Sequence, residues 1–258
     1  MRLDFTDKVV LVTGGTSGIG LASVKLFLQD GAQVMMSGTN SEKADAIISR
    51  LGYDVDDGRG RLRFHQADVA KVDECRRLIE RTVSCFGRID SVVNSAGVFK
   101  FDPIDNVSEA DYDWIMDVNV KGTFFVCKYA VPELRKTCGN IVNISSDAGI
   151  QGNALSSAYC ASKGAVTIFT KALAVDVAPD NVRVNCVCPG DIVTPMLDKD
   201  LARADNPGQY LKNLTDPYPV GRLGNVDEVA SVIAFLASDA SLFTTGAAWS
   251  VDGGITAS

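Results

Sequence analysis

Residues 8–29 read KVVLVTGGTSGIGLASVKLFLQ, and this stretch decides the fold. An apolar β-rich run (8–13), a glycine-rich turn (14–20) and a helical pattern (21–29) follow one another, as in the first half of a βαβ unit. Glycines let a backbone come close to a diphosphate, and the N–H groups at a helix start attract its negative charge. We therefore predict that Gly14, Gly18 and Gly20 contact a dinucleotide, with a tight turn that binds no ligand as the alternative.

A second pattern joins Tyr159 and Lys163, which stand four residues apart within a long helical stretch. Residues at this spacing lie one above the other on the same helix face. A free tyrosine has a pKa of about 10, and a neighbouring cation lowers this pKa. The pair therefore predicts a proton donor and acceptor, with two solvated side chains as the alternative.

Length, composition and charge restrict the class of protein. The chain has 258 residues, 46% of them apolar and 22% charged, so we expect one domain over residues 1–258. A net charge of −7 argues against a nucleic-acid partner, which requires clustered lysine and arginine. The sequence holds no apolar run of about 20 residues and no hydrophobic signal region after its charged start, so we expect no membrane association and a cytoplasmic location.

The cysteines and the single histidine argue against a metal site. Seven cysteines show no Cys-x-x-Cys spacing, and His65 is the only histidine. Ordinary zinc-ligand spacing is therefore missing, and reduced thiols are expected in a chain without a secretion signal. We expect no bound metal. Cys160 adjoins Tyr159, which predicts either a site sensitive to thiol reagents or an inert buried thiol.

Apolar runs alternate with helical patterns along the chain. The runs predict strands near residues 8–13, 33–37, 62–67, 90–94, 140–145, 182–187 and 247–251. The patterns predict helices near residues 18–29, 41–51, 71–86, 108–136, 157–178 and 227–237. This alternation predicts an α/β fold, a doubly wound parallel sheet of about seven strands with helices on both faces. Residues 191–218 lack both patterns and contain several prolines, so we interpret them as an irregular substrate lid.

Four motifs resemble those of the short-chain dehydrogenase/reductase family. They are Thr13-Gly14-x-x-x-Gly18-Ile19-Gly20, Asn94-Ser95-Ala96-Gly97, Tyr159-x-x-x-Lys163 and Pro189-Gly190, in the family's order and spread over nearly the whole chain. Ser95 departs from the family's usual Asn-Asn-Ala-Gly. The resemblance implies a single-domain Rossmann-type fold and an NAD(P)-dependent oxidoreductase acting on a carbonyl or secondary alcohol. It also implies a homotetramer.

The resemblance assigns catalytic roles to Asn119, Ser146, Tyr159 and Lys163. Tyr159 exchanges a proton with the substrate oxygen, and Lys163 lowers the tyrosine pKa and binds the nicotinamide ribose. Ser146, with Ser145 as its nearby competitor, orients the substrate and stabilises the developing alkoxide. Asn119 holds a water that links the lysine to solvent.

By the same resemblance, many positions contact the cofactor. They are Gly14, Ser17, Gly18, Ile19, Gly20, Ser37, Gly38, Thr39, Asn40, Asp68, Val69, Asn94, Ala96, Gly97, Tyr159, Lys163, Pro189, Gly190, Ile192 and Thr194. NAD-preferring relatives carry an acid where this chain has Gly38. The basic residues that commonly bind a 2′-phosphate are missing too, and Ser17 and Thr39 stand in their places. The missing carboxylate favours NADP, and NAD stays open.

The substrate is expected to be a small carbonyl compound or alcohol that contacts Ser146, Gln151, Asn153 and Tyr159. Its identity stays open among ketones, sugars, cyclic alcohols, acyl thioesters and steroids. A serine hydrolase is disfavoured because its nucleophile needs a histidine base, and the lone His65, at the third strand, is poorly placed for that role. The remaining alternative is a nicotinamide-binding regulatory protein of the same fold without turnover.

Overall fold

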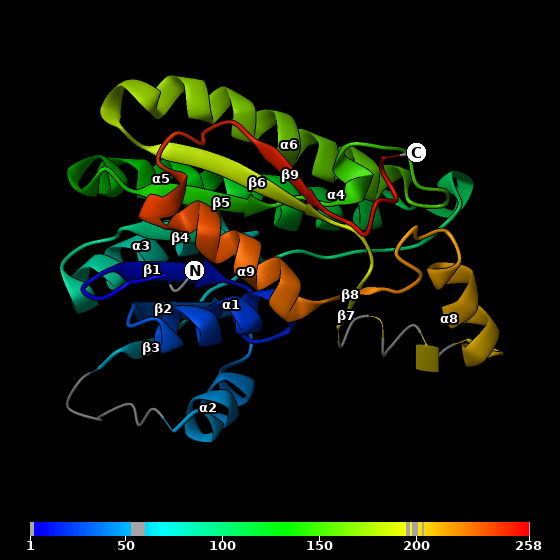
Figure 1. Ribbon diagram of the computed structural model, residues 1–258, viewed down its shortest axis with the longest axis horizontal. Coiled ribbons are helices and arrows are strands. Elements are labelled where there is room, and N and C mark those ends of the chain that lie inside the picture. Colours follow the sequence, from blue (N-terminus) through cyan, green and yellow to red (C-terminus); the bar gives the residue numbers. More distant parts are fainter. Residues whose placement is uncertain (1–2, 53–59, 195–196, 198–200, 203, 258) are drawn as a thin grey trace.

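The structure, a computed structural model, describes residues 3–52, 60–194, 197, 201–202 and 204–257. Its centre is a seven-stranded sheet in the order β3-β2-β1-β4-β5-β6-β9, with every neighbouring pair parallel (Figure 1). The strands are β1 Val9–Thr13, β2 Gln33–Gly38, β3 Leu62–Gln66, β4 Ser91–Asn94, β5 Asn140–Ile144, β6 Arg183–Pro189 and β9 Ala248–Val251. The predicted doubly wound sheet of about seven strands is confirmed.

Helices pack on both faces of this sheet. The described helices are α1 Gly18–Gln29, α2 Ser41–Arg50, α3 Val72–Phe86, α4 Glu109–Met116, α5 Thr123–Thr137, α6 Ser157–Val177, α8 Pro207–Thr215 and α9 Val226–Ala237. Of these, α8 lies apart from the sheet (Figure 1). One apolar cluster joins the sheet to α1, α2 and α9, and a second joins it to α3, α5 and α6 (Figure 1). Within β1, Val10 and Val12 belong to the first cluster and Leu11 to the second, because successive side chains of a strand point to opposite faces. Burial on both faces explains the continuous apolar runs.

The helix predicted over residues 108–136 is interrupted. A π-helix, Asp117–Gly122, separates α4 from α5. A Cβ on Gly122 would lie 2.7 Å from Val69 Cγ2, so this segment comes close to the end of β3. Single π-turns inside helices occur often at functional sites.

The prediction that residues 191–218 are irregular was wrong for two segments. β7, Ile192–Val193, pairs in parallel with β8, Gly224–Asn225, and α8 spans Pro207–Thr215. The α8 helix begins because the Asn206 side chain accepts a hydrogen bond from the Gln209 N–H and Pro207 occupies the first turn. Residues 195–196, 198–200 and 203 of the stretch lie outside the described residues.

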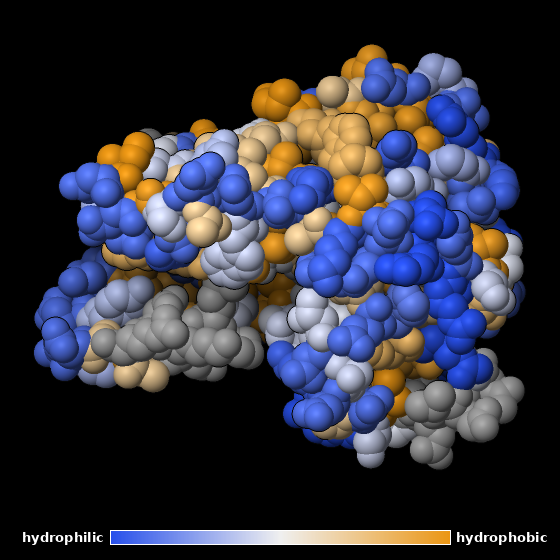
Figure 2. All heavy atoms as spheres, turned by 180° about the vertical axis from the view of Figure 1, so that it is seen from behind, coloured by the Kyte–Doolittle hydropathy of each residue, from blue (hydrophilic) through white to orange (hydrophobic). Residues whose placement is uncertain are grey.

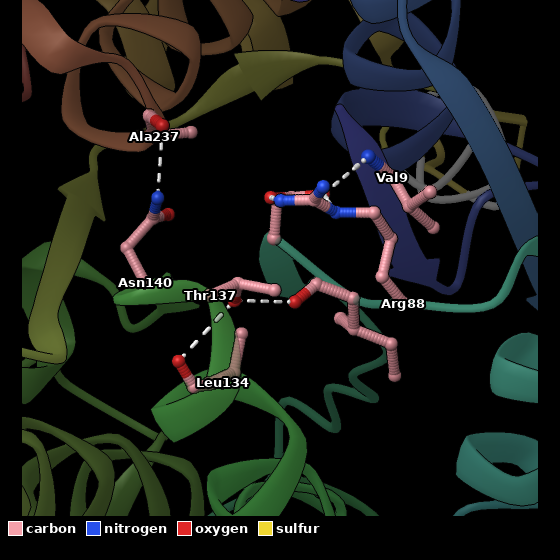
Figure 3. Close-up of polar contacts among 8 residues, drawn as sticks. Val9, Arg88, Leu134, Thr137, Asn140 and Ala237 are labelled. Atoms are coloured by element: carbon pink, nitrogen blue, oxygen red, sulfur yellow. Dashed lines mark hydrogen bonds and ion pairs between the residues drawn. The ribbon is translucent and has the colours of Figure 1, made fainter. Parts of the chain in front are cut away.

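A buried polar network closes the amino ends of the strands. The Asp90 carboxylate accepts hydrogen bonds from the Val9 N–H at 2.9 Å and from the Arg88 guanidinium at 2.6 and 2.9 Å. Asn140 donates to the Ala237 carbonyl, as Figure 3 shows. These contacts join β1, β4, β5 and α9 at the amino end of the strands. Ligands of open α/β sheets bind at the opposite, carboxyl end. Among the described helices, none is both long and apolar enough to cross a membrane.

Candidate active site

The glycine turn lies where the strand order reverses, between β1 and β4. Gly14 has φ +64°, and a Cβ on it would lie 2.8 Å from the backbone of Ala96, so glycine is required for both conformation and space. A Cβ on Gly20 would overlap the Gly14 carbonyl. Ser17 precedes α1 in an extended conformation, and its side chain makes no capping hydrogen bond to the helix. The first N–H groups of α1 therefore face the carboxyl end of β1, where a diphosphate fits.

The end of β2 forms a neutral, narrow site. A Cβ on Gly38 would lie 3.1 Å from Thr16 Oγ1, so Thr16 fills the space of a side chain at this position. Thr39 accepts a hydrogen bond through its carbonyl from Gln66, and Asn40 caps α2 by accepting from the Lys43 N–H. No carboxylate stands where an NAD-preferring relative would have one.

Ser37, which was expected to contact the cofactor, has a buried side chain. Its side chain is fully buried, and its hydroxyl has no hydrogen-bond partner among the described residues. Its carbonyl accepts from the Gly15 N–H. The structure thus places the side chain of Ser37 behind the glycine turn, where it cannot contact a ligand directly.

The ends of β3 and β4 place five further predicted positions. Asp68 is partly exposed, its carboxylate accepts from the Ala70 N–H, and Val69 is buried. Asn94 is buried, and its amide donates to Asn143 Oδ1 at 2.9 Å and to the Cys127 thiol. Asn94 therefore links β4 to β5, whereas Ala96 lies against Gly14 and Gly97 lies beside Asn119 and Lys163.

Ser146 and Tyr159 come together at the end of β5. The Ser146 hydroxyl accepts from the Ala148 N–H and donates to Asp147 Oδ1 at 2.7 Å. The Tyr159 ring is partly buried and packs against the Phe99 ring at 4.9 Å, nearly perpendicular to it. Burial raises the pKa of Tyr159, and a hydrogen-bonding interaction with Ser146 opposes this rise.

The competitor Ser145 is turned into the protein. Its hydroxyl donates to the Lys163 carbonyl and shares a hydrogen bond with Thr167. Ser146 is therefore the serine beside the phenol. To donate to a substrate carbonyl, its hydroxyl has to turn away from Asp147.

Lys163 is buried beneath the tyrosine. Its Nζ lies 5.7 Å from the Tyr159 ring centroid and donates to the Ile144 carbonyl at 2.8 Å. Burial lowers the pKa of Lys163 to about 8. The expected lowering of the Tyr159 pKa by Lys163 is not seen in this structure, because desolvation dominates at the phenol and the ammonium is directed at a backbone carbonyl.

Asn119 lies in the π-helix, and its side chain contacts Val98 and Ser162, the residue before Lys163. Its amide donates to the Val98 carbonyl and to Ser162 Oγ, and its Oδ1 accepts from the Val98 N–H at 2.8 Å. A Cβ on Gly97 would lie 3.4 Å from Asn119 Oδ1 and 3.5 Å from Lys163 Nζ. Gly97 thus keeps a narrow space open between the amide and the ammonium. Because both N–H donors of Asn119 are used, only oxygen lone pairs remain for a water there.

The turn after β6 closes the crevice from the other side. Pro189 ends β6, and the Gly190 N–H donates to the Val251 carbonyl of β9. A Cβ on Gly18 would lie 3.5 Å from Thr194 Cγ2, so this turn approaches the glycine turn after β1. Ile192 is buried, and Ile19 packs against the same apolar cluster.

Two residues of the site were not predicted from the sequence. Asp147 is buried, and its carboxylate accepts from Ser146, from Gln151 at 3.3 Å and from Asn153 at 3.1 Å. Tyr218 is buried, and its hydroxyl accepts from the Asp191 N–H at 2.6 Å. An acid directly after the serine pair was a visible signal for Asp147. Nothing in the local pattern marked Tyr218.

The chain is similar to known oxidoreductases over nearly its whole length. The family model described as enoyl-(acyl carrier protein) reductase matches residues 14–256. L-fucose dehydrogenase of Bos taurus is 38% identical over 258 residues, covering 98% of this chain and 91% of that protein. The 3-oxoacyl-acyl-carrier-protein reductase FabG of Thermotoga maritima is 38% identical over 256 residues, covering 99% of each.

A solved structure agrees with these relatives. The crystal structure of a short-chain dehydrogenase/reductase, glucose/ribitol dehydrogenase, from Brucella melitensis has a TM-score of 0.90 and 34% identity, covering 99% of both chains. Together with the glycine turn and the Ser146, Tyr159 and Lys163 cluster, these similarities identify the protein: the chain belongs to the short-chain dehydrogenase/reductase family.

Proposed function

We propose that Tyr159 exchanges the proton in the reaction of this NAD(P)-dependent oxidoreductase, with Ser146 holding the substrate oxygen. Hydride passes between the substrate carbon and the nicotinamide ring that the bound cofactor supplies. The supporting observation is the convergence of the Ser146 hydroxyl and the Tyr159 phenol above the Lys163 ammonium. The Ser146 hydroxyl can stabilise negative charge on the substrate oxygen, and Tyr159 can give or take its proton.

Lys163 and Asn119 complete this proposal. The ammonium reaches the Ile144 carbonyl now and would hold the nicotinamide ribose when the cofactor is bound. With a pKa of about 8 it still carries a proton at neutral pH, so it can favour the phenolate once the cofactor excludes water. Asn119 would hold a water through its oxygen atoms, which links Lys163 to solvent.

The test replaces Tyr159 by Phe. We expect at least a hundredfold loss of turnover, followed at 340 nm, with a cofactor Kd changed less than threefold. Tyr112→Phe is the matched control, because Tyr112 is exposed on α4 outside the crevice. Substantial remaining activity in Tyr159→Phe removes the phenol from the mechanism.

For the cofactor, we propose NADP over NAD. Gly38 packs against Thr16 next to the amino end of α2, so a neutral glycine stands where an acid would repel a 2′-phosphate. We expect a higher kcat/KM with NADPH than with NADH under identical conditions. A large preference for NADH would contradict the proposal.

Residues 191–218, within one domain over 1–258, are proposed to form the substrate lid. Figure 2 shows a hollow between the lobe that contains α8 and the main body. Tyr218 attaches the end of this segment to Asp191 at the crevice. We expect cofactor and substrate together to slow protease cleavage within residues 204–216, and an unchanged cleavage rate would contradict the lid.

A homotetramer is proposed from exposed apolar side chains. Phe124 on α5 and Ile168 and Val175 on α6 are exposed by 45%, 63% and 75%, and Phe124 packs against Phe169 across the two helices. Light scattering should give about four times the chain mass of 27.5 kDa. Ile168→Glu should lower that mass, whereas the exposed Leu211→Glu on α8 should not. We also propose a cytoplasmic location, which cell fractionation tests.

The substrate class does not follow from similarity. The relatives above are named for L-fucose and for 3-oxoacyl carrier protein, which differ in size, charge and polarity. The substrate side of this chain's own crevice has to decide the class.

A further inference from the structure

The substrate side of the crevice is built around one buried carboxylate. Asp147 Oδ1 accepts from the Ser146 hydroxyl at 2.7 Å, and Oδ2 accepts from Gln151 Nε2 at 3.3 Å and Asn153 Nδ2 at 3.1 Å. We call Asp147, Gln151 and Asn153 the Asp147 wall. Asp147 itself is 7% exposed, whereas Gln151 and Asn153 are partly exposed. A ligand in the crevice therefore meets the two amides before it meets the carboxylate.

The carboxylate fixes which way both amides face. An ionised carboxyl group can only accept hydrogen bonds, so the NH2 groups of Gln151 and Asn153 have to point at it. Their carbonyl oxygens, Oε1 and Oδ1, then point away from Asp147. The three donors also satisfy much of the charge on Asp147. The wall thus presents neutral acceptors to a ligand and holds its negative charge behind them.

The wall lies next to the reacting groups. Ser146 joins it directly to the oxygen-binding position, and the Asp147 charge is close enough to help raise the pKa of Tyr159. The Asn153 N–H also donates to the thiol of Cys160, the residue after Tyr159, which fixes the wall to the start of α6. A group bound by the wall therefore belongs to a carbon near the one that reacts.

We propose that the Asp147 wall selects substrates with a neutral hydroxyl on the carbon next to the reacting carbinol, as in polyols and sugars. This rests on the proposed function of Ser146 and Tyr159. In the oxidation direction the reacting carbon loses hydride to the oxidised nicotinamide and its hydroxyl loses a proton to Tyr159, which yields a ketone. The neighbouring hydroxyl is unchanged and donates to Gln151 or Asn153. Anionic substrates are disfavoured because the wall contains no cation and holds the negative charge of Asp147 behind its amides.

The experiment compares cyclohexanol, trans-cyclohexane-1,2-diol and trans-2-aminocyclohexanol with the full chain and both cofactors. We expect kcat/KM for the diol to exceed that for cyclohexanol about tenfold, in line with roughly one well-placed hydrogen bond. Gln151→Leu and Asn153→Leu should each reduce this ratio at least threefold.

Asp147→Asn should also reduce the ratio, because the neutral amide no longer fixes the orientation of its neighbours. Gln29→Leu and Asp45→Asn are matched controls on exposed positions of α1 and α2, and both should keep the wild-type ratio. Circular dichroism and the cofactor Kd establish that each variant folds and binds cofactor.

Each outcome of this experiment supports or overturns the inference. Equal kcat/KM for diol and cyclohexanol in an active wild-type enzyme overturns the inference and leaves the roles of Ser146 and Tyr159 in place. A ratio unchanged in both leucine variants overturns it too, as does a higher kcat/KM for the amino alcohol than for the diol, which would assign a cation site. Turnover of none of the three compounds overturns the inference, whereas the roles of Ser146 and Tyr159 are tested separately by Tyr159→Phe.

Discussion

Replacing Lys163 by Met should stabilise the ligand-free protein at pH 7 while it removes activity. Burial lowers the pKa of Lys163 from 10.5 to about 8. At about 1.4 kcal/mol per pKa unit, the charged ammonium costs the folded state about 3 kcal/mol. Replacing the lysine removes this cost, but the variant also loses the hydrogen bond to the Ile144 carbonyl, which offsets about 1 kcal/mol of the gain in stability. The net gain is about 2 kcal/mol, or roughly 5 °C in Tm for a chain of this size.

The stability difference between Lys163→Met and wild type should fall as the pH rises. Below pH 8 the lysine is protonated in the folded and the unfolded chain, so the full cost is present. Between about pH 8 and 10.5 the folded chain gives up its proton first, and the cost falls as the pH rises. Above 10.5 both states are neutral and the cost is gone. The advantage of Lys163→Met should therefore shrink steadily through this window.

The assay is the Tm of ligand-free protein, measured by intrinsic fluorescence at pH 7, 8, 9 and 10 and at one protein concentration. Taking the Tm difference between variant and wild type at each pH cancels the contributions of all other titrating groups. Lys171→Met is the matched control, because Lys171 is exposed on the same helix, and its Tm difference should be near zero at every pH. A Lys163→Met protein that is less stable than wild type at pH 7, or a difference independent of pH, refutes the reasoning.

Three further changes test other parts of the structure. Gly14→Ala should lower Tm and weaken cofactor binding at least tenfold by calorimetry, since φ is +64° and the new methyl group would overlap the backbone after β4; an unchanged Kd argues against the diphosphate site. Asp90→Ala should destabilise the protein by about 3 kcal/mol in urea unfolding, because the Val9 N–H loses its buried partner, with kcat/KM of the folded enzyme unchanged. Tyr218→Phe should raise KM several-fold with little change in cofactor Kd, because the Asp191 N–H loses its acceptor; an unchanged KM separates this contact from the substrate side.

Most of the sheet could be predicted because its strands are buried on both faces. Val9–Thr13 is an almost continuous apolar run, and such runs have few other stable arrangements. Arg183–Pro189 is also buried at every position, although it contains Arg183 and Asn185. The π-helix at Asp117–Gly122 could not be predicted, because one widened turn leaves the spacing of apolar residues nearly unchanged. In residues 191–218, Asn206 and Pro207 are a helix start, but both residue types are also common in turns.

The candidate site could be predicted where the motif itself restricts geometry. Gly14 and Gly20 have no room for a side chain, and Lys163 follows Tyr159 by one helical turn. Ser37 was predicted as a cofactor contact, but the fold buries its side chain. This burial depends on packing between segments, which a linear spacing does not contain.

The short β7–β8 ladder has a consequence for how such enzymes change. The chain leaves the crevice at Ile192–Val193 and returns at Gly224–Asn225, two strands that the ladder holds side by side. Asn225 then caps α9, so the return point is anchored to the main sheet. A segment of different length or composition inserted between these anchors would start and finish in the same positions. Replacing this segment could thus change the substrate range without changing the residues that transfer the proton.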